Sequence, residues 1–146
     1  VLDALLEPTR IYVKSIRSVL LQCPGAIHSL AHITGGGITE NLNRALPSTL
    51  DAEIQVGSWN MVPILPWVCR AAHLNETEAL KTFNMGLGMI LAVAPQKADE
   101  VAQLLADAGE EVYIVGQVVP GVGKVVYLDE EELFAAYSED EEVEED

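Results

Sequence analysis

Aromatic side chains are scarce in this chain of 146 residues, since Phe, Trp and Tyr together make up 5% of it. Leu, Ile, Val and Ala must therefore do most of the packing. The sequence is 49% hydrophobic, which is enough for one domain with a core. No apolar run approaches the roughly 20 residues that a membrane span requires, so we expect no membrane partner.

Only two cysteines are present, Cys23 and Cys69, and neither belongs to a Cys-x-x-Cys pair or a Cys/His spacing typical of a metal site. Each falls in the apolar stripe of a predicted helix, which indicates a buried and reduced thiol. Reduced cysteines fit a reducing compartment. We therefore expect a cytoplasmic location and no metal site.

Basic residues are also few, with 8 Lys and Arg against 23 Asp and Glu. Residues 129–146 hold 11 of the acids and no base, which leaves residues 1–128 with 12 acids and 8 bases, a net charge of −4. We predict one domain over residues 1–137 and an acidic, disordered tail over residues 138–146. No basic stripe is available to neutralise phosphates, so a nucleic-acid partner is not expected.

The hydrophobic pattern alternates between helical and strand periodicity along the chain. It predicts helices over residues 9–23, 38–46, 62–74, 75–83 and 96–108 and from residue 129, and strands over residues 26–34, 52–57, 88–95, 111–119 and 123–129. We interpret the last two strands, on either side of Pro120 and Gly121, as a hairpin. This order predicts an α/β (α+β-like) fold, a mixed β-sheet with helices packed mainly on one face.

A run of glycines follows the first predicted strand: Thr34, Gly35, Gly36 and Gly37 lead directly into a helix. Amide groups at a helix start have no intrahelical partner, and glycine removes the Cβ atoms that would hold an anion away. The pattern lacks the lysine of a P-loop and the spacing of a dinucleotide motif. An anion cradle and a tight structural turn both remain open.

Polar residues near the glycines are further candidates. His28 and His32 share one face of the strand, but about 13 Å separates their side chains, too far for one metal ion. His32 is either a substrate-contacting donor or a structural histidine. Arg44 either pairs with Glu40 on the helix surface or faces a cleft together with Asn41.

A second bend, "FNMGLGM" at residues 83–89, contains Asn84, which can bond to a local backbone group or to a ligand. No nucleophile–base pair and no carboxylate dyad stands out. The catalytic residues therefore stay unassigned.

Four stretches, residues 5–16, 31–47, 82–93 and 108–118, together resemble the C-terminal domain of the aminoimidazole ribonucleotide synthetase family, also called phosphoribosylformylglycinamidine cyclo-ligases. Asn43 departs from the pattern, because the family usually has proline there. Since the chain starts at Val1 without a signal peptide, we expect it to be a fragment of a longer protein. The resemblance implies the mixed sheet of that domain and a separate N-terminal domain that holds most of the ATP and Mg²⁺ site.

The family's reaction is the ATP-dependent closure of the imidazole ring of formylglycinamidine ribonucleotide, in de novo purine synthesis. The resemblance therefore implies this substrate, the N-terminal domain and a second copy of the parent enzyme as partners, and an inactive fragment. It implies substrate or phosphate contacts at these residues: Thr34, Gly35, Gly36, Gly37, His32, Asn41, Arg44, Asn84, Gly86 and Gly88.

Two other interpretations stay open. One is a related ATP-using enzyme, such as a formylglycinamidine synthetase, a selenophosphate synthetase or a thiamine-monophosphate kinase. The other is a stand-alone module that binds anions.

Overall fold

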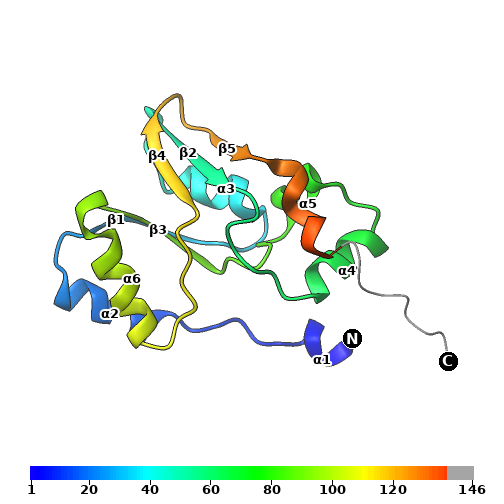
Figure 1. Cartoon of the computed structure of the whole chain (residues 1–146), viewed down its shortest axis with the longest axis horizontal. Coiled ribbons are helices and arrows are strands. Elements are labelled where there is room, and N and C mark those ends of the chain that lie inside the picture. Colours follow the sequence, from blue (N-terminus) through cyan, green and yellow to red (C-terminus); the bar gives the residue numbers. More distant parts are fainter. Residues whose placement is uncertain (138–146) are drawn as a thin grey trace.

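Five strands form two separate sheets, and helices cover both of them (Figure 1). The structure is a computed structural model and describes residues 1–137. The predicted mixed α/β class is confirmed, whereas the single sheet is replaced by a two-stranded and a three-stranded one. The predicted tail, residues 138–146, lies outside the described residues.

The elements alternate much as the hydrophobic pattern predicts. The helices are α1 (Leu2–Leu5), α2 (Val13–Gln22), α3 (Gly37–Arg44), α4 (Ile64–Ala71), α5 (Glu76–Thr82) and α6 (Ala98–Asp107), with 3-10 helices η1 (Pro95–Lys97) and η2 (Glu130–Tyr137). The strands are β1 (Ile27–His32), β2 (Leu50–Gln55), β3 (Met89–Val93), β4 (Gly116–Pro120) and β5 (Val125–Leu128). None of the helices within residues 1–137 has the length and apolar character to cross a membrane.

The smaller sheet pairs β1 with β3 in antiparallel orientation, and His32 lies opposite Met89 at its end. One further bond, from the Ile33 amide to the Gly88 carbonyl at 2.9 Å, continues the pairing past the sheet. The two glycine-containing segments of the chain are therefore held side by side where the first of them leaves the sheet.

The larger sheet corrects the predicted hairpin. Strands β4 and β5 both pair with β2, β4 antiparallel and β5 parallel, so β2 separates them. The loop between them crosses the start of β2, where the carboxylate of Asp51 accepts bonds of 2.8 Å from the amides of Val122 and Lys124. An apolar pattern cannot reveal that a third strand lies between two consecutive ones.

Buried apolar side chains form two clusters. The larger one includes Ile33, Ile38 and Leu80 and lies around α3, α5 and β2. The smaller one joins α2 to α6 through Val19 and Val101, at the end of the molecule opposite α4 and α5 (Figure 1). Each cluster contains one buried free cysteine, Cys69 in the larger and Cys23 in the smaller, as the helical stripes predict.

Candidate anion-binding site

The glycine turn, residues 34–37, connects the end of β1 to the start of α3. Gly36 is the N-cap residue with a φ of 96°, and Gly37 has a φ of 63°. Both angles lie in the left-handed region, which only glycine adopts without strain. The Gly37 amide donates to the Thr34 carbonyl at 3.0 Å, so the turn itself uses this donor.

The three glycines have different steric surroundings. A Cβ atom on Gly37 would overlap the backbone carbonyl of Leu80, because the turn is pressed against the end of α5. At Gly35, by contrast, nothing lies within 4 Å of that position, and its φ is outside the left-handed range. A tight structural turn therefore explains why residue 37 is a glycine. At Gly35 the space next to the backbone is open, so a ligand could approach it closely.

Asn41 ties the turn together from inside. Its side-chain nitrogen lies 3.3, 3.2 and 2.8 Å from the carbonyl oxygens of Thr34, Gly35 and Gly37, and the residue is only 8% exposed. Arg44 donates to the side-chain oxygen of Asn41 at 2.7 Å. Both predicted residues thus lie at the turn. Asn41 is buried and bonds to the turn directly, and Arg44 contacts the turn only through Asn41.

The carboxylate of Glu40 lies against Gly36. A Cβ atom on Gly36 would overlap Oε2 of Glu40, whose side chain is the flexible partner in this contact. The predicted surface pair between Glu40 and Arg44 is absent from the salt bridges of residues 1–137, because Arg44 bonds to Asn41 instead. A negative charge therefore rests at the positive end of α3, where an anionic ligand would bind.

His32 lies two residues before the turn and is exposed, as is His28 on the same face of β1. Its ring stands edge-on to the ring of Tyr12, with centroids 6.1 Å apart and an interplanar angle of 69°. No group of three His, Cys, Asp or Glu side chains that could hold a metal ion occurs in residues 1–137.

The second glycine bend has the hydrogen bonding of a supporting turn. The side-chain oxygen of Asn84 accepts from the Gly86 amide at 2.9 Å, and Gly86 has a φ of 94°. The indole nitrogen of Trp59 donates to the Met85 carbonyl at 2.8 Å. Of the two roles predicted for Asn84, the bond to a local backbone group is present. The bend meets the first glycine segment at the bond from Ile33 to Gly88.

Two tyrosines next to these segments were not among the site residues predicted from the sequence. The hydroxyl of Tyr127 lies 2.7 Å from the side-chain oxygen of Thr39 in the first turn of α3, and burial raises the pKa of Tyr127 to about 12. Burial also raises the pKa of Tyr12, and the nearby carboxylate of Glu110 adds to the effect. The hydroxyl of Tyr12 takes the space that a side chain at residue 88 would fill, a contact between distant segments that the sequence does not reveal.

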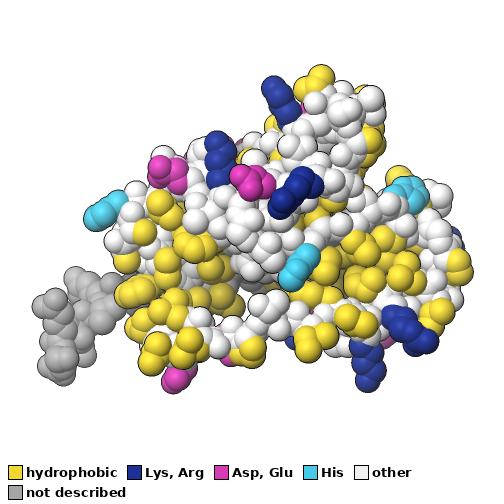
Figure 2. Space-filling view, turned by 180° about the vertical axis from the view of Figure 1, so that it is seen from behind, with side chains coloured by type: hydrophobic (Ala, Val, Ile, Leu, Met, Phe, Trp, Pro, Cys, Tyr) yellow, Lys and Arg dark blue, Asp and Glu magenta, His cyan; other side chains and the backbone are white. Residues whose placement is uncertain are grey.

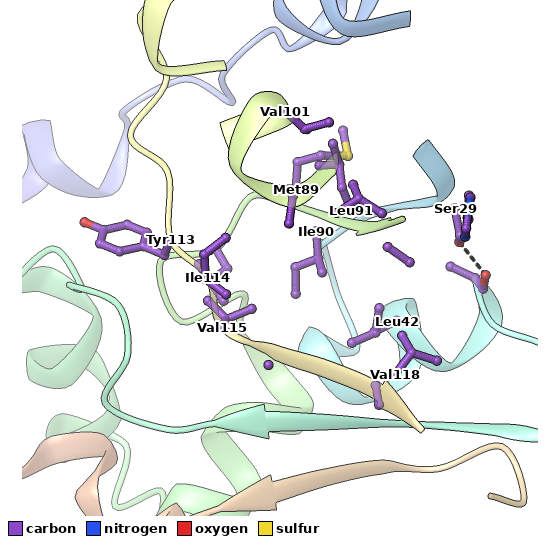
Figure 3. A pocket seen from close by; sticks show the side chains of 18 of the residues that line it. Ser29, Leu42, Met89, Ile90, Leu91, Val101, Tyr113, Ile114, Val115 and Val118 are labelled. Atoms are coloured by element: carbon purple, nitrogen blue, oxygen red, sulfur yellow. Dashed lines mark hydrogen bonds between the residues drawn. The ribbon is translucent and has the colours of Figure 1, made fainter. Parts of the chain in front are cut away.

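A large cavity lies elsewhere, between the smaller sheet, α6 and the segment leading into β4 (Figure 3). Its volume is about 880 Å³, and side chains such as Leu42, Met89, Val101 and Val118 line it. Residues 32–37 are not among its lining residues, and of the glycine turn Thr34 and Gly35 are exposed, whereas Gly37 is buried. In Figure 2 the hydrophobic side chains of one face gather in patches, and the Lys and Arg side chains are scattered around them.

Comparison with known proteins agrees with the resemblance. The family described as "AIR synthase related protein, C-terminal domain" matches residues 1–129. The phosphoribosylformylglycinamidine cyclo-ligase of Brevibacillus brevis is 46% identical over 125 residues, which cover 86% of this chain and 36% of that protein. The bifunctional purine biosynthetic protein purD of Dictyostelium discoideum is 44% identical over 117 residues, 80% of this chain and 14% of that protein.

Among solved structures, Escherichia coli HypE, a hydrogenase maturation protein, has a similar fold. It matches with a TM-score of 0.62 and 23% identity, over 86% of this chain and 40% of that one. This likeness concerns the fold alone. The chain spans about a third of the length of the curated cyclo-ligases that it matches.

Proposed function

Because the chain belongs to the AIR synthase related family, matching its C-terminal domain, we propose that it supplies the C-terminal part of a phosphoribosylformylglycinamidine cyclo-ligase. The observation that carries the proposal is the identity of 44–46% to proteins of purine biosynthesis over four fifths or more of the chain. The reaction would be the ATP-dependent closure of the imidazole ring of formylglycinamidine ribonucleotide, in the cytoplasm.

In this proposal the glycine turn holds a phosphate group of the substrate or of the activated intermediate. Gly35 permits close approach, since no heavy atom lies near its missing side chain. The N-terminal end of α3 supplies a partial positive charge, and Asn41 keeps the turn in one conformation. Such a site acts by positioning and by stabilising charge, which phosphoryl chemistry chiefly requires.

His32 and Thr34 would contact the ligand beside the turn, and Gly86 and Gly88 would support the wall next to it. Residues 1–137 bring together no group of three His, Cys, Asp or Glu side chains, so they offer no Mg²⁺ site built from such protein ligands alone. In line with the family resemblance, we assign ATP and Mg²⁺ mainly to the N-terminal part of the parent enzyme and derive no step through them. If the site is divided in this way, the partners of this chain are the N-terminal domain and a second copy of the parent enzyme. The chain alone is then expected to be inactive.

A chimera tests this proposal. The matching C-terminal third of the Brevibacillus brevis cyclo-ligase would be replaced by this chain, and ring closure would be measured as ATP-dependent formation of aminoimidazole ribonucleotide. We expect an active chimera, no turnover by the chain alone, and a severe loss of turnover in the chimera with Gly35→Val. A folded but inactive chimera would refute the assignment, and turnover by the chain alone would refute the division of labour.

A further inference from the structure

Three segments that are far apart in the sequence meet at Tyr12. This residue precedes α2, and its ring stands edge-on to the ring of His32 at the end of β1. Its hydroxyl oxygen lies against Gly88, just before β3, where an added Cβ atom would overlap it. Tyr12 therefore contacts both glycine-containing segments at the point where they run side by side.

The contact with Tyr12 explains why residue 88 is a glycine. The φ of Gly88 lies outside the left-handed range, so the backbone conformation does not require glycine there. The space that a side chain would fill is instead taken by the Tyr12 hydroxyl. Since the Gly88 carbonyl accepts from the Ile33 amide at 2.9 Å, the backbone under Tyr12 is also the backbone that anchors the entry into the glycine turn.

The segment around Tyr12 is itself fixed in place. Arg10 and Ser15 each bond to one carboxylate oxygen of Glu110 at 2.6 Å, and Arg10 also donates to the Gly109 carbonyl at 3.0 Å. The Glu110 side chain is only 12% exposed, so solvent weakens this clamp less than it weakens a surface ion pair. The clamp holds the backbone on both sides of Tyr12.

We propose that Tyr12 is a positioning residue, which holds the imidazole of His32 in the orientation that contacts the anionic ligand at the glycine turn. This inference rests on the proposed function. An edge-on aromatic neighbour restricts the rotation of an otherwise exposed histidine, and the seat on Gly88 fixes the neighbour in turn. Tyr12 acts through His32 and does not itself touch the ligand.

The test uses the full chain with inorganic phosphate as the probe. NMR would follow the ring protons of His32, assigned with His32→Gln, and phosphate affinity would be taken from the shift of the Gly35 amide. We expect Tyr12→Leu to move the His32 ring signals and to weaken phosphate binding three- to tenfold. Tyr12→Phe, which keeps the ring, should restore the ring signals and most of the affinity. Ile11→Ala, a neighbour that is 81% exposed, is the matched control and should change neither.

A double-mutant cycle separates positioning from general support of the fold. In the His32→Gln background, Tyr12→Leu should cost no further affinity, because the residue through which it acts is gone. Gly88→Ala, whose added methyl group would overlap the hydroxyl and ring edge of Tyr12 and displace the ring, gives a second route and should reproduce the loss only when His32 is present. Both variants must first show the dispersed amide spectrum of the wild type.

The outcomes are distinct. If the wild type binds phosphate and Tyr12→Leu binds it equally well, or loses affinity equally in both backgrounds, the positioning role is overturned while the proposed site stands. Unmoved His32 ring signals in Tyr12→Leu overturn it as well. If the wild type binds no phosphate at the turn, the proposed anion site falls, and the positioning role falls with it.

Discussion

The guanidinium of Arg44 donates a hydrogen bond of 2.7 Å to the side-chain oxygen of Asn41, and this bond leaves the amide nitrogen of Asn41 directed at the carbonyls of the glycine turn. An exposed arginine thus orients a buried asparagine. The asparagine in turn holds the backbone conformation on which the proposed site depends.

Replacing Asn41 should therefore destabilise the domain. Asn41→Ala removes the side-chain donor to the Thr34, Gly35 and Gly37 carbonyls, which we expect to lower the free energy of unfolding by about 1–3 kcal/mol. Urea denaturation measures the change. The exposed neighbour Asn43 is the control, because Asn43→Ala should stay within about 0.5 kcal/mol. Equal effects at both positions would contradict the role of Asn41.

Glu40 provides a test of the anion site. Its carboxylate lies against Gly36, so an incoming phosphate must displace or repel it. Glu40→Gln should tighten the binding of inorganic phosphate about three- to tenfold, since roughly 1 kcal/mol of repulsion is removed at a solvated site. The affinity would be measured by NMR at low ionic strength. Glu131→Gln, an exposed acid on η2, should leave the affinity unchanged. Weaker phosphate binding in Glu40→Gln would contradict a phosphate held at Gly36.

The glycines of the turn should respond differently to the same substitution. Gly37→Ala combines a left-handed φ with overlap on the Leu80 carbonyl, and we expect it to cost at least about 2 kcal/mol of stability. Gly35→Ala has open space and no left-handed φ, so its cost should stay below about 1 kcal/mol. Thermal and urea unfolding of the two variants check this. Similar losses at both positions would mean that Gly35 also has a structural role.

Much of the fold could be predicted from local patterns, because the contacts that decide it are local. The capping box of α5, with Asn75 and Glu78 bonding to each other's backbone amides, follows from two residues three positions apart. The buried cysteines follow from the apolar stripes of their helices. The insertion of β2 between β4 and β5 depends on Asp51 meeting a loop some seventy residues away, and no local pattern contains that contact.

The candidate site divides in the same way. The left-handed glycines were readable as a turn, because their spacing at a strand–helix junction is itself the signal. The position of the Glu40 carboxylate against Gly36 could not be predicted. The spacing of four residues suggests that Glu40 pairs with Arg44, but Arg44 bonds to Asn41 instead. Tyr12 was missed because its contacts with His32 and Gly88 join segments 20 and 76 positions away.

Asp51 should make the stability of the larger sheet depend on acidic pH. Backbone bonds from Lys124 and Val122 hold the pKa of Asp51 below its ordinary value of 3.8. A lowered folded-state pKa means stability that is fully present above the unfolded value and is lost as the pH falls through the folded one. Urea midpoints measured from pH 6 down to about pH 2 should therefore fall less steeply in Asp51→Asn than in the wild type. Asp3→Asn, at an exposed position of α1, should retain the wild-type slope.

Tyr127 should impose the opposite dependence at alkaline pH. Its folded-state pKa of about 12 exceeds the ordinary value of 10.0, mainly because the side chain is partly buried, with its hydroxyl against Thr39 of α3. A raised folded-state pKa contributes stability that is complete below pH 10 and is lost as the pH rises toward 12. The loss should amount to on the order of 2 kcal/mol, and Tyr127→Phe should lack it. At neutral pH the same variant should cost about 1 kcal/mol, because the bond to Thr39 is gone.

Urea midpoints at pH 8, 10 and 11.5 separate the two effects of Tyr127. The stability advantage of the wild type over Tyr127→Phe should shrink by pH 10 and reverse by pH 11.5, because the wild type alone must then bury a phenolate or expose Tyr127. Thr39→Ser keeps a hydroxyl at 2.7 Å reach of Tyr127 and should follow the wild type throughout. A difference that stays constant over this range would show that the Tyr127 phenol titrates as freely in the fold as in the unfolded chain, and would remove burial as the cause of its raised pKa.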